Sequence, residues 1–328
     1  MSILVSPQKR KKLLKKLLIS IQNHESAIIE ALQKDFKKPP FETYITEINY
    51  VISDLKHTIS NVENWSKPKR VWPSILNFPS SDYIYTEPYG RVLIISPWNY
   101  PFQLAMCPLI AAIAAGNTIV LKPSELTFNT SQLITKIVEE VFNVKEVVVV
   151  HGGAEFTQSL LENRWDYIFF TGSVFVGKIV AQAAAKNLTP YTLELGGKNP
   201  CIVDEGADLE IAVKRIVWGK FINAGQTCIA PDYVLLPEGR EKQFADEFAK
   251  AVAAFYNPNG KGVASSSDYS RIINRKNLLR LKNLMEQDLE AGAHLLYGGA
   301  MDEDDWFIEP TLLGNMKPYM GLMQQESF

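Results

Sequence analysis

Short apolar runs alternate with amphipathic stretches along the middle of the chain, and this alternation predicts its architecture. Five β-branched, apolar runs have the length of buried strands and lie at residues 91–96, 117–121, 146–151, 166–170 and 191–195. Helical segments lie between them, at residues 102–115, 131–142, 154–163 and 176–186. Such alternation predicts a parallel sheet that is covered by helices on both faces.

Two further regions flank this block. Residues 7–65 have apolar positions spaced by three and four, which predicts helices, and they lead into a connector rich in proline and serine, SKPKRVWPSILNFPSS. Beyond the block a further α/β set follows, with strands at PCIVD, DYVLL and HLLYG and helices near 208–220, 240–255 and 274–290. We therefore expect an N-terminal domain at residues 1–196 and a C-terminal domain at 197–328, and we expect the latter to be incomplete because no closing strand follows.

Composition and charge narrow the range of functions. The chain is 46% hydrophobic and 21% charged, as is ordinary for a globular protein, and its net charge of −2 gives no reason to expect nucleic acid as a partner. Its longest apolar run, 104–115, contains a proline and is too short to cross a bilayer. Three cysteines in a chain of this size indicate thiols in a reducing compartment, which predicts a cytoplasmic location.

Ligands of an open parallel sheet bind at the carboxyl ends of its strands, so the loops there carry the candidate chemistry. Asn99, in SPWNYPF, offers an amide donor that could stabilise an oxyanion or cap the next helix. Lys122 and Glu125, in LKPSE, suit the hydroxyls of a ribose or form a solvated ion pair.

Two more loops follow later strands. Gly172 and Gly177, in FTGSVFVG, form a glycine turn before a helix, which could bind a phosphate or merely connect the elements. The fingerprint G-x-G-x-x-G is absent. Glu194, in LELGGK, stands in an apolar strand end, where burial would raise its pKa and make it a general base, unless it pairs with Lys198.

The stretch FINAGQTCIA contains Cys228, which is either a small buried hydrophobe or a reactive thiol. The NAGQT residues before it resemble a loop with exposed amides, which weakens the packing interpretation, although the stretch taken alone still favours packing. A cysteine hydrolase would need a histidine, and only His151 is a serious candidate. No Cys or His residues have the spacing of zinc ligands, so we expect no metal.

Taken in order, SPWNYPF, LKPSE, FTGSVFVG, LELGGK, NAGQTC and the final ESF strongly resemble the aldehyde dehydrogenase superfamily. NAGQTCIAPDYVL and PPFETYITEI most resemble its class 3 branch, whose members take fatty and aromatic aldehydes. The resemblance implies a Rossmann-type sheet that binds NAD or NADP, an α/β catalytic domain, and a homodimer at full length. In the family a Gly-Pro and over a hundred further residues normally follow ESF, so this chain resembles a truncated member.

The resemblance also implies a role for individual residues. Cys228 would be the nucleophile, Glu194 the general base, and Asn99 the oxyanion donor together with the Cys228 backbone N–H. The implied cofactor contacts are Lys122, Glu125, Gly172, Ser173, Gly177, Leu195, Gly196, Glu326 and Phe328. Tyr100 and Trp218 would line the aldehyde tunnel.

The implied reaction oxidises an aldehyde to a carboxylic acid through a cysteine thiohemiacetal and a thioester, which water then hydrolyses. One alternative is an aldehyde dehydrogenase that transfers the acyl group to CoA, and Glu194 argues against it because a base for water serves hydrolysis. The other alternative is a catalytically impaired fragment that retains the fold.

Overall fold

The computed structural model describes residues 6–328 and contains two compact units. The first comprises residues up to Ala31 together with Tyr44–Glu194, and the second comprises Leu32–Thr43 and Leu195–Phe328. The division expected from the sequence, between residues 196 and 197, differs in placing residues 32–43 and residues 195–196 with the first domain.

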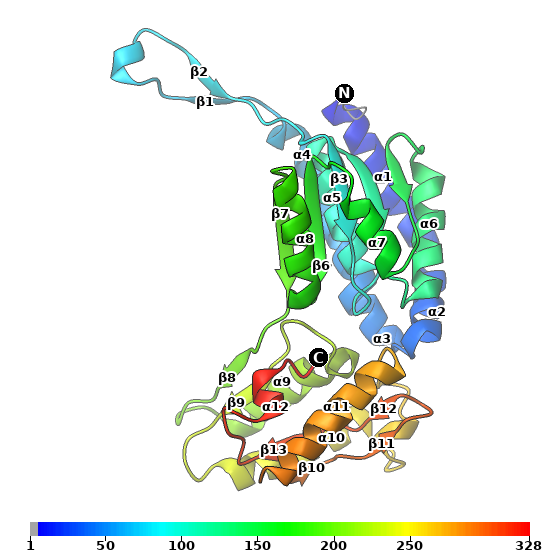
Figure 1. Cartoon of the computed structure of the whole chain (residues 1–328), viewed down its shortest axis with the longest axis vertical. Coiled ribbons are helices and arrows are strands. Elements are labelled where there is room, and N and C mark those ends of the chain that lie inside the picture. Colours follow the sequence, from blue (N-terminus) through cyan, green and yellow to red (C-terminus); the bar gives the residue numbers. More distant parts are fainter. Residues whose placement is uncertain (1–5) are drawn as a thin grey trace. The chain divides into compact units, whose positions relative to one another are not determined.

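A five-stranded sheet forms the centre of the first unit (Figure 1). Its strands are β3 (Arg91–Ile95), β4 (Thr118–Lys122), β5 (Val147–Val149), β6 (Tyr167–Gly172) and β7 (Tyr191–Leu195), in the order β5-β4-β3-β6-β7. The central strand β3 pairs in parallel with both β4 and β6. Leu93 and Ile94 are at most 1% exposed because helices cover both faces, so the predicted α/β sheet is confirmed.

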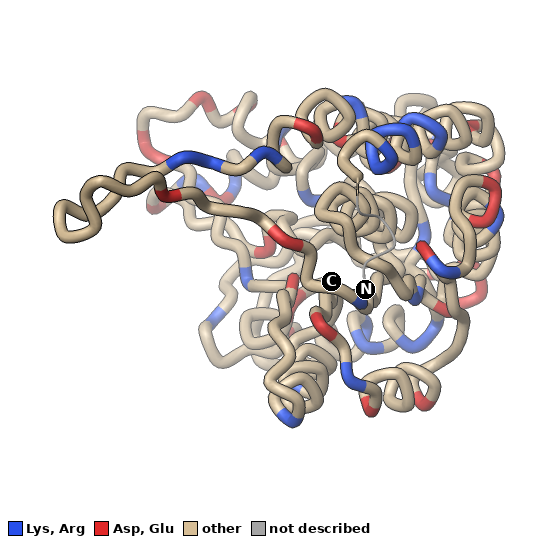
Figure 2. Tube along the Cα trace, turned by 90° about the horizontal axis from the view of Figure 1, so that it is seen from above, with Lys and Arg blue, Asp and Glu red and all other residues tan. Residues whose placement is uncertain are grey.

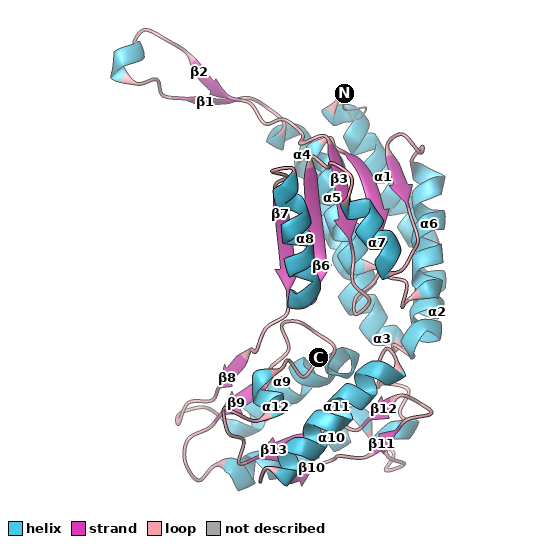
Figure 3. Cartoon of the chain, in the orientation of Figure 1, coloured by secondary structure: helices cyan, strands magenta, loops and turns pink. Residues whose placement is uncertain are grey.

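Helices surround this sheet (Figure 3). They are α1 (Pro7–Asn23), α4 (Asn49–Trp65), α5 (Gln103–Ala115), α6 (Phe128–Val141), α7 (Ala154–Leu161) and α8 (Val174–Lys186). Helix α2 (Glu25–Phe36), helix α3 (Pro40–Thr43) and a π-helix (Tyr44–Ile48) connect α1 to α4. Within residues 6–328, no helix combines the length and apolar character that a membrane crossing requires.

The stretch indicated as a connector forms a hairpin, here called the hairpin arm, residues 69–84. Its strands β1 (Lys69–Val71) and β2 (Asp82–Ile84) pair antiparallel, and Figure 1 shows it extending away from the sheet. Charged residues lie only toward its base (Figure 2). Trp72 and Leu76, near its tip, are 97% and 93% exposed.

The second unit contains α9 (Leu209–Phe221), α10 (Glu241–Tyr256), α11 (Arg275–Glu290) and α12 (Gly321–Gln324). Three two-stranded sheets accompany these helices, namely β8 (Pro200–Ile202) with β9 (Tyr233–Leu235), β10 (His294–Tyr297) with β13 (Leu312–Gly314), and β11 (Met301–Asp302) with β12 (Phe307–Ile308). The β8–β9 pair is parallel and the other two are antiparallel. Its apolar core packs α9 against α10, with Phe221 and Phe248 in edge-to-face contact.

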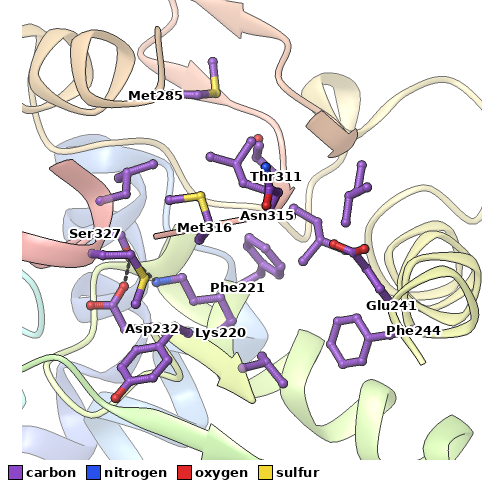
Figure 4. Close-up of a pocket in the computed structure, with 18 of the residues that line it drawn as sticks. Lys220, Phe221, Asp232, Glu241, Phe244, Met285, Thr311, Asn315, Met316 and Ser327 are labelled. Carbon is purple, nitrogen blue, oxygen red and sulfur yellow. Dashed lines mark hydrogen bonds between the residues drawn. The ribbon is translucent and has the colours of Figure 1, made fainter. Parts of the chain in front are cut away.

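A cavity of about 510 Å³ lies in the second unit. Residues 232–239, which include β9, and residues 311–316, which include β13, contribute to its wall together with Phe221 and Phe244. Figure 4 shows Lys220, Asp232 and Ser327 at one end of it. The cavity therefore has mainly apolar walls, with Lys220 and Asp232 at one end and Glu241 on another side.

Candidate active site

The first unit carries its sequence-predicted groups at one edge of the sheet. Asn99 follows β3, Lys122 ends β4, Gly172 ends β6, and Glu194 lies near the end of β7. Figure 3 shows these strands running in the same direction, so their carboxyl ends share an edge. The structure thus brings together, within one unit, four of the positions from which a dinucleotide fold contacts its ligand.

Asn99 is buried, with 3% of its surface exposed, in the turn between β3 and α5. It does not cap α5, because the residue before that helix is Phe102 and no side chain caps it. The Glu47 carboxylate instead accepts the N–H groups of Phe102 and Gln103, at 3.0 and 2.9 Å. The capping alternative for Asn99 is therefore excluded.

Lys122 and Glu125 form an ion pair at the end of β4, with 2.6 Å between Nζ and Oε2. The lysine is 4% exposed, whereas the carboxylate-bearing side chain is 45% exposed. The Lys122 ammonium group is therefore buried, while the Glu125 carboxylate remains accessible, so this is not a fully solvated surface pair. Such a carboxylate can accept hydrogen bonds from the hydroxyls of a ribose.

The start of α8 forms the next part of this edge. Ser173 caps α8, since its Oγ accepts the N–H of Val176 at 3.3 Å. Val174 and Phe175 are exposed, so the positive end of the helix dipole is accessible to an anion. Gly177 lies buried inside α8, where its N–H donates to the Ser173 carbonyl at 2.9 Å.

The burial expected for Glu194, which would have made it a general base by raising its pKa, is not observed. Its side chain is exposed on β7. The alternative pairing with Lys198 is not observed either, since Lys198 Nζ lies 2.7 Å from Asp232 Oδ2. What supports Glu194 as a base is thus its place at the end of the strand.

In the second unit, a left-handed turn precedes Cys228. Asn223, Ala224 and Gly225 have φ of 59°, 53° and 82°, and the first two cost energy in this conformation because they carry a Cβ. Asn223 and Gln226 are at most 1% exposed. The sequence-based expectation of an exposed loop is therefore wrong at these two residues.

The Gln226 side chain stabilises the turn from within. Its Nε2 donates to the carbonyls of Asn223 and Arg271, both at 3.0 Å. Its Oε1 accepts the N–H of Ile273 at 2.9 Å. This buried amide therefore joins the turn to a neighbouring segment, as buried polar groups generally require.

The segment after the turn is held by Asn199. Its Nδ2 donates to the carbonyls of Cys228 and Ala230, at 2.7 and 3.1 Å. Cys228 is half-buried, and none of the chain's three cysteines, all in the described part, takes part in a disulfide. Burial raises the pKa of Cys107 to about 12 and that of Cys201 above its usual value, so both stay protonated near neutral pH.

The final ESF residues lie beside the glycines that follow β7. Glu326 Oε1 accepts the N–H of Gly197 at 3.3 Å, and Arg280 donates to the carbonyls of Glu326 and Phe328. A side chain at Gly196 would place its Cβ 2.0 Å from Glu326 Oε2, so the Glu326 carboxyl would have to move away. These contacts bring together Gly196, Glu326 and Phe328, three of the implied cofactor contacts, and Leu195 directly precedes the glycines.

Charged groups reinforce the same region. Lys220 Nζ donates to Ser327 Oγ at 2.8 Å, and Ser327 in turn donates to Asp232 Oδ1 at 2.5 Å (Figure 4). Lys198 also pairs with Asp232. Burial lowers the pKa of Lys220, although the nearby Asp232 acts in the opposite direction.

The remaining candidates belong to different units. Tyr100 is buried in the first unit, and Trp218, 49% exposed, lies on α9 of the second. His151 belongs to the first unit, where its Nε2 lies 2.7 Å from Thr135 Oγ1. Among the described residues, no cluster of three or more His, Cys, Asp or Glu side chains is arranged to hold a metal ion.

Residues 223–230 are here called the Cys228 loop. Three residues that hold this loop could not be identified from the sequence. They are Glu42, Asn199 and Gln226. The signal for the last two was their position, since Asn199 directly follows LELGGK and Gln226 lies within NAGQTC. Glu42 lies within PPFETYITEI, but that motif gives no sign of a contact with the Cys228 loop, because it is far from Cys228 in the sequence.

Comparisons with known proteins agree with this arrangement. Residues 4–328 match the sequence model of the aldehyde dehydrogenase family. The chain is 47% identical over 319 residues to 4,4'-diaponeurosporen-aldehyde dehydrogenase of Staphylococcus aureus, covering 97% of this chain and 68% of the relative. It is 41% identical over 308 residues to the "Aldehyde dehydrogenase, dimeric NADP-preferring" of Canis lupus familiaris, covering 94% and 66%.

Solved structures give the same result. The substrate-bound state of Staphylococcus aureus AldH matches with a TM-score of 0.94 and 45% identity, over 99% of this chain and 70% of that one. A Mycobacterium tuberculosis aldehyde dehydrogenase complexed with NAD+ matches with a TM-score of 0.87 and 28% identity, over 98% and 66%. The chain spans 62% of the length of some curated relatives and 72% of another.

The family motifs stand at the strand ends and in the cysteine loop, and the family match covers nearly every residue. The chain therefore belongs to the aldehyde dehydrogenase family, whose members oxidise aldehydes with NAD(P).

Proposed function

We propose that this chain oxidises an aldehyde to a carboxylic acid with NAD or NADP, and that Cys228 is the nucleophile. The observation that carries the proposal is the Cys228 loop. A half-buried thiol follows a strained turn that buried side chains hold in place, as is typical of reactive sites. The acceptors and donors at the sheet edge of the first unit supply the other groups that such a reaction needs.

The Cys228 thiolate attacks the carbonyl carbon of the aldehyde, and a C–S bond forms while the carbonyl oxygen becomes an oxyanion. The amide of Asn99 and the N–H of Cys228 donate to that oxygen. A bound nicotinamide would supply the acceptor for the hydride that leaves this carbon. A thioester remains on Cys228. Glu194 takes a proton from water, which attacks the thioester, so that the C–S bond breaks and the acid leaves.

The residues at the sheet edge fit a dinucleotide. The ion pair at the end of β4 offers a fixed ammonium donor and an accessible carboxylate for ribose hydroxyls, and the start of α8 offers an anion site. The Glu125 carboxylate disfavours the 2′-phosphate of NADP, because like charges repel. One relative is named NADP-preferring and one similar structure contains NAD+, so both cofactors are tested.

The test is a panel of short-chain, aromatic and long-chain aldehydes with each cofactor, followed by the absorbance of the reduced nicotinamide. Cys228→Ser should abolish turnover, and Cys201→Ser is the matched control that should retain it. Asn99→Ala should lower turnover by about a hundredfold or more, because one oxyanion donor is lost. Full activity of Cys228→Ser would refute the proposal, and an acyl-CoA product instead of the acid would favour the acylating alternative.

We also propose that this protein forms a homodimer through the hairpin arm and works in the cytoplasm. The arm exposes Trp72, Ile75 and Leu76 by 93% or more, and such apolar surface is typical of an interface. One relative is named dimeric, and three cysteine thiols suit a reducing compartment. Analytical ultracentrifugation compares the molecular mass of wild type with that of the double variant Trp72→Ser/Leu76→Ser. We expect wild type to be a dimer and the variant a monomer, and the same mass for both proteins at every concentration would refute the proposed interface.

A further inference from the structure

The left-handed turn before Cys228 needs support from outside itself. Asn223 and Ala224 adopt a conformation that residues with a side chain rarely take, and Gly225 continues it. Strained backbone of this kind persists only where surrounding contacts fix it. Gln226 supplies such contacts from within the loop, so the question is which group fixes the turn from elsewhere in the second unit.

Glu42 is that group. It lies on α3, 181 residues before Asn223 in the sequence, and only 6% of it is exposed. Its Oε2 accepts the backbone N–H of Asn223 at 2.9 Å and the Ser270 hydroxyl at 3.4 Å. A buried carboxyl that accepts the N–H of the first strained residue can hold the backbone in this conformation.

We propose that Glu42 is a positioning residue for the Cys228 loop, and that its contact with the Asn223 amide holds the left-handed turn that presents the Cys228 thiol. The inference rests on the proposed function only in treating Cys228 as the nucleophile. Glu42 acts through the turn and takes no part in the chemical steps. Its loss therefore changes the rate of the reaction more than the affinity for the aldehyde.

The first experiment compares Glu42→Ala, which lacks the acceptor, with Glu42→Gln, whose amide oxygen can still accept the Asn223 N–H. Glu205→Ala, at an exposed glutamate of the same unit, is the matched control. We expect Glu42→Ala to lower kcat by about tenfold or more with little change in KM, since a hydrogen bond to a buried acceptor is lost. Glu42→Gln should retain kcat within about threefold of wild type at neutral pH.

Hydrogen exchange of the peptide 221–230 measures the turn without requiring turnover. Exchange of this peptide should accelerate by about tenfold in Glu42→Ala and stay near wild type in both Glu42→Gln and the Glu205 control. Unchanged exchange and unchanged kcat in a folded Glu42→Ala would overturn the inference while leaving the proposed function intact. Faster exchange in a protein that oxidises no aldehyde would support the positioning of the loop and refute the dehydrogenase proposal.

A double variant keeps the inference testable where Glu42→Ala fails to fold. Ala224→Gly removes the side chain that strains the turn, so the turn then needs less support. Glu42→Ala should therefore cost less in the Ala224→Gly background, whether the cost appears in folding yield or in kcat. An equal cost in both backgrounds would show that Glu42 does not act on the turn.

Discussion

The raised pKa of Glu42 should make the stability of the second unit depend on pH. Burial raises the pKa of this carboxyl from 4.5 to about 7, and the bond from Asn223 and the charge of Lys38 only partly offset it. Asp268 raises it further, and the hydroxyls of Tyr256 and Tyr269 also face Glu42. Between pH 4.5 and 7 the folded chain thus keeps a proton that the unfolded chain has lost.

The sign and size follow from this difference. Stability is unaffected by Glu42 below pH 4.5, falls as the pH rises toward 7, and stays lower above it. At about 1.4 kcal/mol for each pH unit, the loss reaches about 3 kcal/mol. Glu42→Gln carries no proton that titrates, so the difference in stability between wild type and this variant should change by about 2.5 kcal/mol between about pH 5 and about pH 8.

Hydrogen exchange of peptides from α10 and α11 measures this difference, because their slowest amides report the unfolding of the second unit. Wild type and Glu42→Gln are compared at the same pH, so that the intrinsic exchange rate cancels. Burial also raises the pKa of Glu326, which is present in both proteins and cancels as well. A difference that stays constant within about 0.5 kcal/mol across this pH range would refute the reasoning.

Three further predictions concern other residues. Gly298→Ala should lower the thermal stability of the second unit by about 2 kcal/mol or more, because φ is +74° and the new Cβ would lie 2.1 Å from the Pro310 carbonyl oxygen. Asn199→Ala should lower kcat by about tenfold, since the Cys228 carbonyl loses its donor at 2.7 Å. Glu125→Gln should raise the NADP-to-NAD ratio of kcat/KM by about tenfold, because a charge that repels the 2′-phosphate is removed.

Each of these predictions has its own control. Gly260→Ala has a similar φ of +68° but open space around the new Cβ, so it should cost less than the change at Gly298. Asn199→Asp keeps the size of the side chain but lacks the donor, and wild-type kcat in that variant would contradict the role given to this amide. If the NADP-to-NAD ratio of kcat/KM is unchanged in Glu125→Gln, the ribose does not bind beside Glu125.

The sheet of the first unit could be predicted from the sequence because its strands are buried on both faces. Residues such as Leu93 and Ile94 form continuous apolar runs, and helical spacing separates one run from the next. The same topology predicts that Asn99 and Lys122 share a sheet edge. The hairpin arm could not be predicted, because strands of three residues hold too few positions to show a period.

The site could be predicted in its residue types but not in its contacts. Ala224 has no intrinsic preference for a left-handed conformation, so only tertiary contacts, such as those of Glu42, account for the turn. Glu194 has apolar neighbours in the sequence and was expected to be buried, but the covering of a strand end depends on elements distant in the chain. The local sequence therefore predicts which residues belong to the site, but it does not determine how deeply each of them is buried.

The cavity of the second unit has a consequence for how the protein behaves in solution. β9 pairs with β8 along one edge and β13 with β10 along one edge, and the cavity wall includes both β9 and β13. Strand edges without a neighbour recruit extended segments from other chains. Within residues 6–328, these strand edges are therefore candidate sites of self-association beside the hairpin arm proposed above. Only association that the arm variant abolishes and dilution reverses therefore counts as the specific dimer.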